Sequence, residues 1–325
     1  MLEVLQKPFK IVTRTVARKE DVVDLIVNHY RKQEAKSLKP LPEQMPSVLS
    51  TVTMGLGDTV MLTDLPRAAA QQKKDFACYS GSQHFLPLMS FNPWFKQRAD
   101  KAFMVNAPDL VRQYDCGNGH YLQRIRRAFG LKVDDCPRGC IAWRGSRSPN
   151  RVILHFEPGV HVNWQRKTIH PKARHLYSDT KIELEKFIRE MPGYQFVQLG
   201  KQNLFIKGSQ WVQTQTTVDL VNQIGQASWF IGIMSGPMHV ATALELKCVV
   251  VCNFPEAEKI VLPTLKVTGN VEEEWQYGMN VHLHQDGESQ LVPKANSVNL
   301  HRAFDGQVYP FWSRDYLSLI HECIP

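Results

Sequence analysis

The most constraining feature of this sequence is a regular alternation of short apolar runs and amphipathic segments between residues 151 and 254. Apolar runs occupy 151–159, 194–200, 228–234 and 247–254, and segments with helical spacing separate them at 179–191, 217–227 and 236–246. Strands separated by helices pair in parallel, through right-handed crossovers that place helices on both faces of the sheet. The pattern therefore predicts a doubly wound α/β sheet in the second half of the chain.

The first half shows the same alternation in shorter pieces. Strands are predicted at 47–53, 75–81 and 101–106, a Gly-containing turn and a helix follow the first of them near Asp58, and another helix is predicted at 119–130. The segment 141–150 loses the hydrophobic pattern and indicates an interdomain linker. We therefore expect four parts: a helical extension (1–45), an N-terminal domain (46–148), a C-terminal domain (149–308) and a closing helix (309–325).

Composition narrows the class of protein. The 325 residues are 43% hydrophobic and 22% charged, which is typical of a soluble globular protein with room for two domains. The net charge of +8 favours phosphate-rich partners, namely nucleotides, nucleic acid or an anionic membrane surface. Seven cysteines in a chain of this size do not form a secreted disulfide scaffold, so we expect a reducing cytoplasm.

The amino-terminal sequence and the hydropathy pattern argue against membrane insertion. The first residues carry too many charges for a signal peptide, and no run approaches the roughly 20 apolar residues of a membrane-spanning helix. We therefore expect any membrane contact to be peripheral.

Three stretches that follow predicted strands carry candidate chemistry, because ligands of such sheets collect at the carboxyl ends of the strands. A Ser-Gly-Pro turn entering a helix at 235–239 suits a phosphate, although it is also an ordinary capped helix. Asp58 can cap its own helix or accept a proton from an attacking hydroxyl. Arg166 and Lys167, after Gly159, can lie beside a diphosphate or in a solvated loop.

Together these stretches resemble the successive motifs of family 9 glycosyltransferases, the heptosyltransferase group. The matching stretches are "MGLGDTVMLTDLPRA", "ILHFEPG…WQRKTIHP" and "DLVNQIGQASWFIGIMSGPMHVATALELKCVVVCNFPE", in the family's order across about 47–260. The resemblance implies the GT-B fold, in which two Rossmann-like domains face each other across a cleft. It also implies an acceptor site in the N-terminal domain and a nucleotide-sugar site in the C-terminal domain, with ADP-heptose the donor of the best-known members.

The resemblance also implies roles for single residues. Asp58 matches the family's general base, and Lys167 or the adjacent Arg166 matches the basic residue that offsets the charge of the leaving diphosphate. The donor-binding positions are Gly55, Gly57, Gly159, Arg166, Ser235, Gly236, Pro237, Met238 and His239. The implied reaction inverts the sugar carbon by direct displacement and uses no metal or cofactor beyond the nucleotide-sugar co-substrate.

One residue departs from the family pattern and keeps alternatives open. The family turn reads Asp-Ser/Thr-Gly, and this sequence has Met234 in the Asp position. The expected function is transfer of a heptose or another hexose-like sugar to a lipopolysaccharide or capsule precursor, in the cytoplasm or at the inner face of its membrane. The alternatives are a GT-B transferase acting on a protein or a modified nucleic-acid base, and a non-catalytic nucleotide-sugar-binding relative.

Two groups of residues have side chains that bind metals elsewhere. Cys116, His120, Cys136 and Cys140 give a C-x3-H-x15-C-x3-C pattern that matches no common zinc-finger spacing. His282 and His284 share a face of a predicted strand, which is also the pattern of a polar sheet face. We expect no metal site from either group.

Overall fold

The structure is a computed structural model. It describes residues 39–41, 48–50, 55–74, 77–79, 86–89, 91–94, 104–106, 114–117, 120–133, 138–157, 175–200, 204–252, 278–285 and 293–308. The closing helix predicted at 309–325 lies outside these residues, as does the N-terminal extension apart from 39–41. Within the described part, no helix is long and apolar enough to cross a membrane.

The second half forms a six-stranded parallel sheet, which confirms the α/β fold class. Its strands are β4 (Ser148–His155), β5 (Gln195–Leu199), β6 (Gln210–Val212), β7 (Ala227–Ile233), β8 (Lys247–Cys252) and β9 (Val281–His284). They lie in the order β6-β5-β4-β7-β8-β9, and every neighbouring pair is parallel. Counted from β4 this is the order 3-2-1-4-5-6 of a Rossmann sheet, in which the chain changes direction of winding between β4 and β7.

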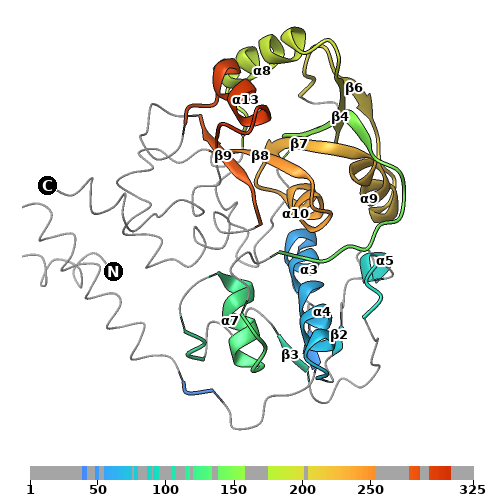
Figure 1. The fold of residues 1–325 in the computed structure, drawn as a ribbon, viewed down its shortest axis with the longest axis vertical. Helices are drawn as coiled ribbons and strands as arrows, with labels where there is room; N and C mark the ends of the chain where they lie inside the picture. The colour runs from blue at the N-terminus through green and yellow to red at the C-terminus, as the bar shows by residue number, and fades with distance from the viewer. Residues whose placement is uncertain are drawn as a thin grey trace, which may run out of the picture.

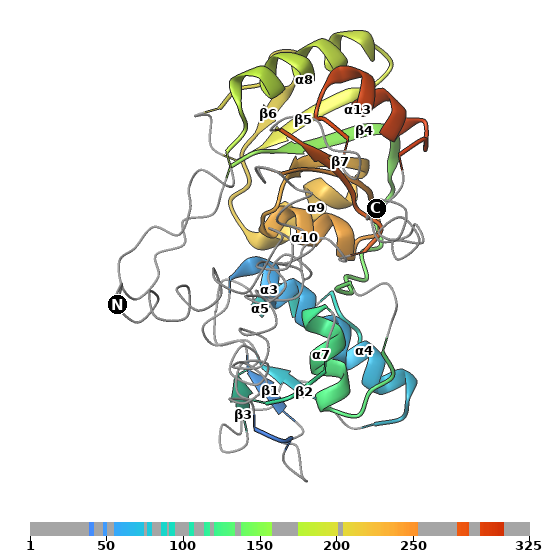
Figure 2. The ribbon, with the colours of Figure 1, turned by 90° about the vertical axis from the view of Figure 1, so that its left-hand side faces the viewer.

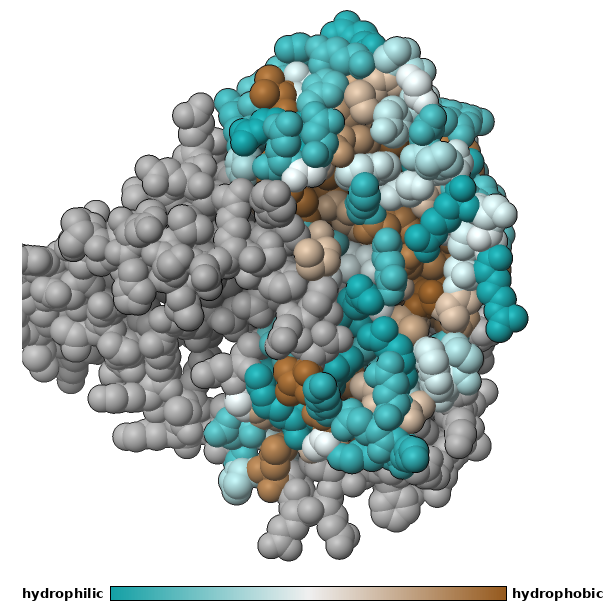
Figure 3. Space-filling view, viewed as in Figure 1, coloured by the Kyte–Doolittle hydropathy of each residue, from teal (hydrophilic) through white to brown (hydrophobic). Residues whose placement is uncertain are grey.

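Helices cover both faces of this sheet (Figures 1 and 2). The helices α8 (Ser178–Glu190) and α13 (Ser297–Phe304) pack together on one face, and α9 (Thr217–Gly225) and α10 (Gly236–Ala243) cover the other. Apolar side chains of alternate strand positions bury against each helix layer, as a doubly wound sheet requires. Figure 3 shows hydrophilic residues over the outer helices and hydrophobic ones lower down, at the level where the two halves meet.

The first half contains a smaller parallel sheet and its own helices. The strands β1 (Val48–Ser50), β2 (Ala77–Tyr79) and β3 (Met104–Asn106) lie in the order β2-β1-β3. The helices of this half are α3 (Leu56–Leu62), α4 (Asp64–Gln71), the short α5 (Leu86–Met89) and α7 (Tyr121–Ala128). Fully buried side chains join α3, α4 and α7, including Leu62, Leu65, Leu122 and Ile125.

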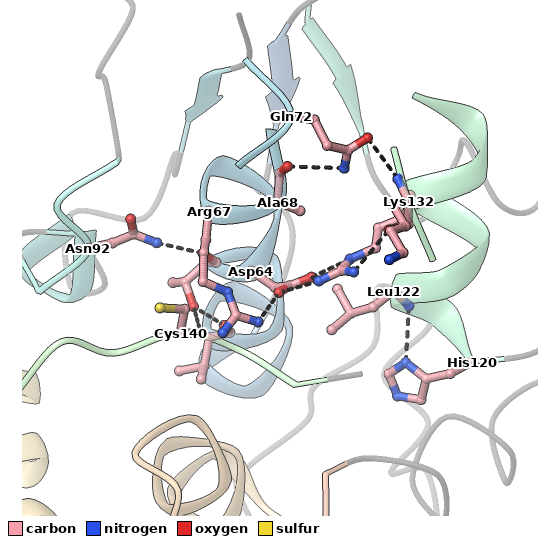
Figure 4. A network of polar contacts seen from close by, with 12 residues as sticks. Asp64, Arg67, Ala68, Gln72, Asn92, His120, Leu122, Lys132 and Cys140 are labelled. Atoms are coloured by element: carbon pink, nitrogen blue, oxygen red, sulfur yellow. Dashed lines mark hydrogen bonds and ion pairs between the residues drawn. The ribbon is translucent and has the colours of Figure 1, made fainter. Parts of the chain in front are cut away.

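A buried ion cluster links α4 to α7 (Figure 4). Asp64 is fully buried, and its carboxylate accepts hydrogen bonds from the Nε and Nη2 of Arg126 at 2.7 and 2.6 Å and from the Nη2 of Arg67 at 2.7 Å. Arg126 also donates to the carbonyl oxygen of Lys132 at 3.0 Å. Two guanidinium groups around one carboxylate supply the pairing that a buried charge needs.

The connection between the halves is hydrogen-bonded to both of them. Ala142 N–H donates to the carbonyl oxygen of Phe91 at 2.8 Å, and Ile141 N–H donates to that of Ala243 in α10 at 3.4 Å. The strand β4 begins at Ser148, three residues before the strand predicted at 151–159, because the N–H of Ser148 already donates to the carbonyl oxygen of Gln226. The pairing of β4 with β7 then shifts register between Ser148 and Val152. The predicted linker 141–150 therefore includes the first residues of β4.

Candidate functional site

The N-termini of two helices from different halves of the molecule meet at the candidate site. α3 begins after Gly55 and α10 begins after Ser235, and the two helices pack against each other (Figures 1 and 2). A Cβ atom at Gly57 would lie 2.5 Å from Cδ2 of His239, and one at Gly236 would lie 2.8 Å from a methyl group of Leu56. Glycine at both positions lets the two helix starts approach this closely.

Asp58 occupies the third position of α3 and is half-buried. Its Oδ2 accepts a hydrogen bond from the backbone N–H of Gly55 at 3.0 Å, so the side chain caps its own helix. A carboxylate has about four lone-pair directions, so this cap leaves the group the capacity to accept another proton or hydrogen bond. The capping and proton-acceptor interpretations of Asp58 are therefore compatible.

The turn at 235–239 leads from the carboxyl end of β7 into α10. Ser235 is the N-cap residue and Pro237 lies in the first turn, where its missing N–H breaks no helical bond. The Ser235 side chain makes no hydrogen bond to its own helix. The N–H groups at the start of a helix have no intrahelical acceptors, so this end of α10 presents N–H donors and the positive end of its dipole.

The other side chains of the turn are largely enclosed. Met238 is fully buried, and its sulfur contacts the Nδ2 of Asn280 at 3.2 Å, so the backbone is the part of Met238 that a ligand can reach. His239 is 8% exposed and packs over Gly57. Met234, in the position where the family has aspartate, is a buried apolar residue.

The sheet topology places this turn where a ligand is expected. In a sheet of order 3-2-1-4-5-6, ligands bind outside the carboxyl ends of the first and fourth strands, at the point where the winding reverses. These strands are β4 and β7, which end at His155 and Ile233. The turn at 235–239 directly follows β7, so it lies at that point.

Sequence reasoning missed one residue at the same point, His155. It is 8% exposed, and its Nδ1 lies 3.2 Å from Oγ of Ser235. Burial lowers the pKa of His155 to about 4. A histidine as the last residue of a buried strand next to the switch point was the available signal, but its partner lies 80 residues away in the sequence.

Glu157 lies near the carboxyl ends of β4 and β5. A Cβ atom at Gly200 would lie 3.1 Å from its carboxylate, and Gly200 has a φ of +113°, which favours glycine. The Nε1 of Trp211 donates to the carbonyl oxygen of Gly200 at 2.8 Å. The carboxyl edge of the sheet therefore carries an acidic side chain beside Gly200, on the β5 side of β4.

Three predicted site residues, Gly159, Arg166 and Lys167, lie outside the described residues. Their roles beside the donor diphosphate stay predictions. The described residues bring together the other predicted positions, because Gly55, Gly57 and Asp58 belong to the start of α3 that packs on the turn at 235–239.

One described member of the predicted metal-like groups, His120, is used by its own helix. His120 is the N-cap of α7, where its Nδ1 accepts from the N–H of Leu122 at 3.1 Å. Burial raises the pKa of the Cys116 and Cys140 thiols. Cys136 lies outside the described residues, and no group of three or more His, Cys, Asp or Glu suited to a metal occurs within them.

A cavity of about 480 Å³ lies at the opposite edge of the sheet. Trp229, Lys247 and Val281, near the starts of β7, β8 and β9, line it together with Phe304 of α13. Because a doubly wound sheet binds ligands at its carboxyl edge, we place the candidate site at the turn after β7 rather than at this cavity.

Comparison with known proteins supports the fold. No protein-family model matches the sequence, and no curated protein matches it. A glycosyl transferase family 9 structure from Veillonella parvula aligns over 83% of this chain and 98% of its own, with 11% identity and a TM-score of 0.50. This chain has the fold of a family 9 glycosyltransferase.

Two further structures are similar over parts of the chain. The E. coli heptosyltransferase WaaC, solved with ADP, aligns over 80% of this chain and 97% of its own, with 9% identity and a TM-score of 0.49. The iron-containing dodecameric glycosyltransferase TibC of enterotoxigenic E. coli aligns over 66% of this chain with 16% identity and a TM-score of 0.48. The matched part spans 59% of the TibC chain.

Proposed function

We propose that this protein is an inverting glycosyltransferase that moves a sugar from a nucleoside-diphosphate donor to a saccharide acceptor. The observation that carries the proposal is the meeting of two helix starts at the carboxyl edge of a Rossmann sheet. One brings a half-buried carboxylate, Asp58, from the first half, and the other brings the open N-terminus of α10 from the second half. A proton acceptor and an anion site on facing halves are the two elements that a displacement of diphosphate requires.

The donor diphosphate is proposed to bind at the N-terminus of α10. Backbone N–H groups and the helix dipole favour a phosphate there, and Ser235 adds a hydroxyl beside them. The neighbouring Met234 is apolar and carries no negative charge, and this absence of repulsion favours the binding of an anionic group. Arg166 and Lys167 are proposed to approach the same diphosphate and to offset the charge that develops as it leaves.

The proposed chemical step is a single displacement. Asp58 accepts the proton of an acceptor hydroxyl, and the oxygen attacks the anomeric carbon of the donor sugar as the bond from that carbon to the diphosphate oxygen breaks. The electron pair of the broken bond goes to the nucleoside diphosphate, which the α10 terminus and the basic residues stabilise. Attack opposite the leaving group inverts the anomeric carbon, and no metal is needed in this scheme.

The acceptor is proposed to be an anionic cell-surface saccharide, such as a lipopolysaccharide or capsule precursor on the cytoplasmic side of the membrane. The net charge of +8 would attract such a substrate as well as the donor. Because of the sequence resemblance to heptosyltransferases, ADP-heptose is the first donor to test.

Binding of the donor nucleotide is the first experiment. Isothermal titration calorimetry with ADP, UDP, GDP and CDP, in buffer containing EDTA, should detect one nucleotide that binds more tightly than the others. Thermal stabilisation by the same nucleotide should follow, because a ligand that binds only the folded state raises its stability. Failure of all four nucleotides to bind would overturn the proposed donor site.

The role of Asp58 is tested with a matched control. Asp219 is the third residue of α9, and its Oδ2 accepts from the N–H of Thr216 at 3.0 Å, as Asp58 does from Gly55 in α3. Asp58→Asn and Asp219→Asn should therefore weaken helix caps alike, but only Asp58→Asn should lower sugar transfer, by roughly 100-fold or more. Equal transfer by both variants would exclude Asp58 as the base, and nucleotide binding without any transfer or donor hydrolysis by the wild type would indicate a non-catalytic binding protein.

A further inference from the structure

His155 is a buried histidine to which the proposed reaction gives no role. It is the last residue of β4, and its Nδ1 lies 3.2 Å from Oγ of Ser235. In the parallel pairing of β4 with β7, His155 lies opposite Gly232, three residues before Ser235. This contact therefore joins the ends of the two strands between which the winding of the sheet reverses.

The contact changes what Ser235 does at the start of α10. A serine at an N-cap normally accepts a hydrogen bond from an N–H of the first helical turn. Thr216 makes this bond at the start of α9, where its hydroxyl accepts from the N–H of Asp219 at 3.0 Å. The Ser235 hydroxyl makes no such bond and faces His155 instead. The N–H groups at the start of α10 are thus not capped by the Ser235 hydroxyl.

We propose that His155 is a positioning residue for the donor phosphate: its Nδ1–H donates to Oγ of Ser235, which directs the serine hydroxyl proton toward a phosphate oxygen. The inference rests on the proposed function, because it assigns a partner within the same donor site. A phosphate oxygen accepts hydrogen bonds, so Ser235 can bind it only by donating its single proton. That proton is available only if the imidazole acts as the donor in the contact between His155 and Ser235.

The environment of His155 suits this role. Burial lowers its pKa to about 4, so near neutral pH the ring is uncharged and carries one N–H. A neutral ring can hold the serine oxygen without placing a full charge in the buried layer under the turn. The alternation along β4 puts His155 on the face of Ile153, which packs in the same apolar cluster as Val240 and Ala241 of α10.

The proposal predicts that His155 acts on nucleotide binding only through Ser235. We would measure the Kd of the nucleoside diphosphate that binds most tightly among ADP, UDP, GDP and CDP, for wild type, Ser235→Ala, His155→Ala and the double variant. Ser235→Ala should weaken binding about tenfold, which corresponds to the loss of one hydrogen bond to a charged group. His155→Ala should weaken binding severalfold, and the double variant should bind no more weakly than Ser235→Ala.

Two further substitutions separate positioning from general packing. The amide of asparagine can place an N–H near the position of Nδ1, so His155→Asn should restore binding to within about twofold of wild type. His155→Gln carries its amide one carbon further from the backbone, near the position of Nε2, and should bind as weakly as His155→Ala. His155→Asn also provides a conservative variant for measurement if His155→Ala does not fold.

The outcomes distinguish this inference from the proposed function. Additive losses in the double variant, no loss of binding in His155→Ala, or equal binding by the Asn and Gln variants would each overturn the positioning role while leaving the donor site in place. If the wild type binds none of the four nucleotides, the proposed function itself fails and the inference fails with it.

Discussion

Two buried polar contacts in this protein offset the cost of burying a titratable group in different ways: one pairs a charged side chain with cations, and the other keeps the side chain neutral. Asp64 keeps its partners close on several sides, with two hydrogen bonds from Arg126 and one from Arg67. His155 has a contact with one hydroxyl, that of Ser235, and its pKa is lowered to about 4 by burial. A buried carboxylate is stable when it is paired with cations. A buried imidazole can lose its proton and become neutral, so it needs no charged partner.

The Asp64 cluster stabilises the fold, whereas the contact of His155 with Ser235 lies at the candidate site. The guanidinium groups surround Asp64 between α4 and α7 (Figure 4), and all three residues belong to the first half of the chain. The pair of His155 and Ser235 lies at that edge, where a helix start is left open. We therefore expect substitutions in the first contact to change stability, and substitutions in the second to change ligand binding as well.

The largest expected effect is on stability, from removing Asp64. Asp64→Ala should lower the free energy of unfolding by about 3–5 kcal/mol, because the buried guanidinium of Arg126 and the half-buried one of Arg67 lose the carboxylate between them. Chemical denaturation measures this loss, and Glu190→Gln is the control, since the contact of Glu190 with His301 is partly exposed and should contribute less than about 1 kcal/mol. Similar losses in both variants would mean that the Asp64 cluster is no more stabilising than a surface pair.

The second prediction concerns pH and follows from the neutral state of His155. The pKa of this residue is about 4 in the folded protein and near its ordinary value of 6.5 in the unfolded chain. Between pH 4 and 6.5 the unfolded state binds more protons than the folded state. The contribution of neutral His155 to the free energy of unfolding is therefore complete above pH 6.5 and is lost as pH falls toward 4. The loss should reach about 3 kcal/mol.

His155→Asn provides the test of that pH dependence. Denaturation curves at several pH values between 7 and 4 should show a shallower fall in stability for the variant than for wild type, because asparagine does not titrate. Parallel curves for the two proteins would mean that His155 is not held neutral in the folded state.

Much of the fold could be predicted from the sequence because its signals are local. The apolar runs and helical spacing between 151 and 254 predicted β4, β5, β7 and β8 with their helices, and the parallel pairing followed from the alternation. The strand β6 and the helix α13 were missed. β6 has only three residues and lies on the sheet edge, and α13 follows an irregular stretch whose composition gave no clear periodicity.

The contacts between distant residues could not be predicted in the same way. Asp64 and Arg126 are 62 residues apart, and His155 and Ser235 are 80 apart, so neither pairing leaves a local pattern. The turn at 235–239 was recognisable because Ser, Gly and Pro at a helix start each have a conformational reason to be there. Which distant residues contact each other depends on the order of the strands in the sheet, and local sequence patterns do not reveal that order.

The third prediction tests how closely the two halves must approach at the site. Gly57→Ala places a Cβ 2.5 Å from the ring of buried His239, so the ring or the helix must move. Overpacking of this kind costs about 1–3 kcal/mol, and the higher helix propensity of alanine offsets part of it. We expect a net loss of about 1–2 kcal/mol together with weaker nucleotide binding.

Gly193→Ala is the matched control for this substitution. Among the described residues, no atom beyond the chain neighbours of Gly193 lies within 4 Å of the Cβ that alanine would add there, so Gly193→Ala should change stability by less than about 0.5 kcal/mol. If Gly57→Ala behaved like Gly193→Ala in both stability and nucleotide binding, the close contact between α3 and α10 would not matter for the site.

The smallest expected effect distinguishes the caps of α9 and α10. Thr216→Ala removes a side chain that bonds its own helix and should cost about 1 kcal/mol, whatever residue occupies position 155. Ser235→Ala should cost a similar amount only when His155 is present, because its hydroxyl bonds the imidazole rather than the helix. Denaturation of each variant with and without His155→Ala measures this coupling. An equal cost of Ser235→Ala in both backgrounds would show that Ser235 caps α10 as Thr216 caps α9, and the contrast between the two helix starts would disappear.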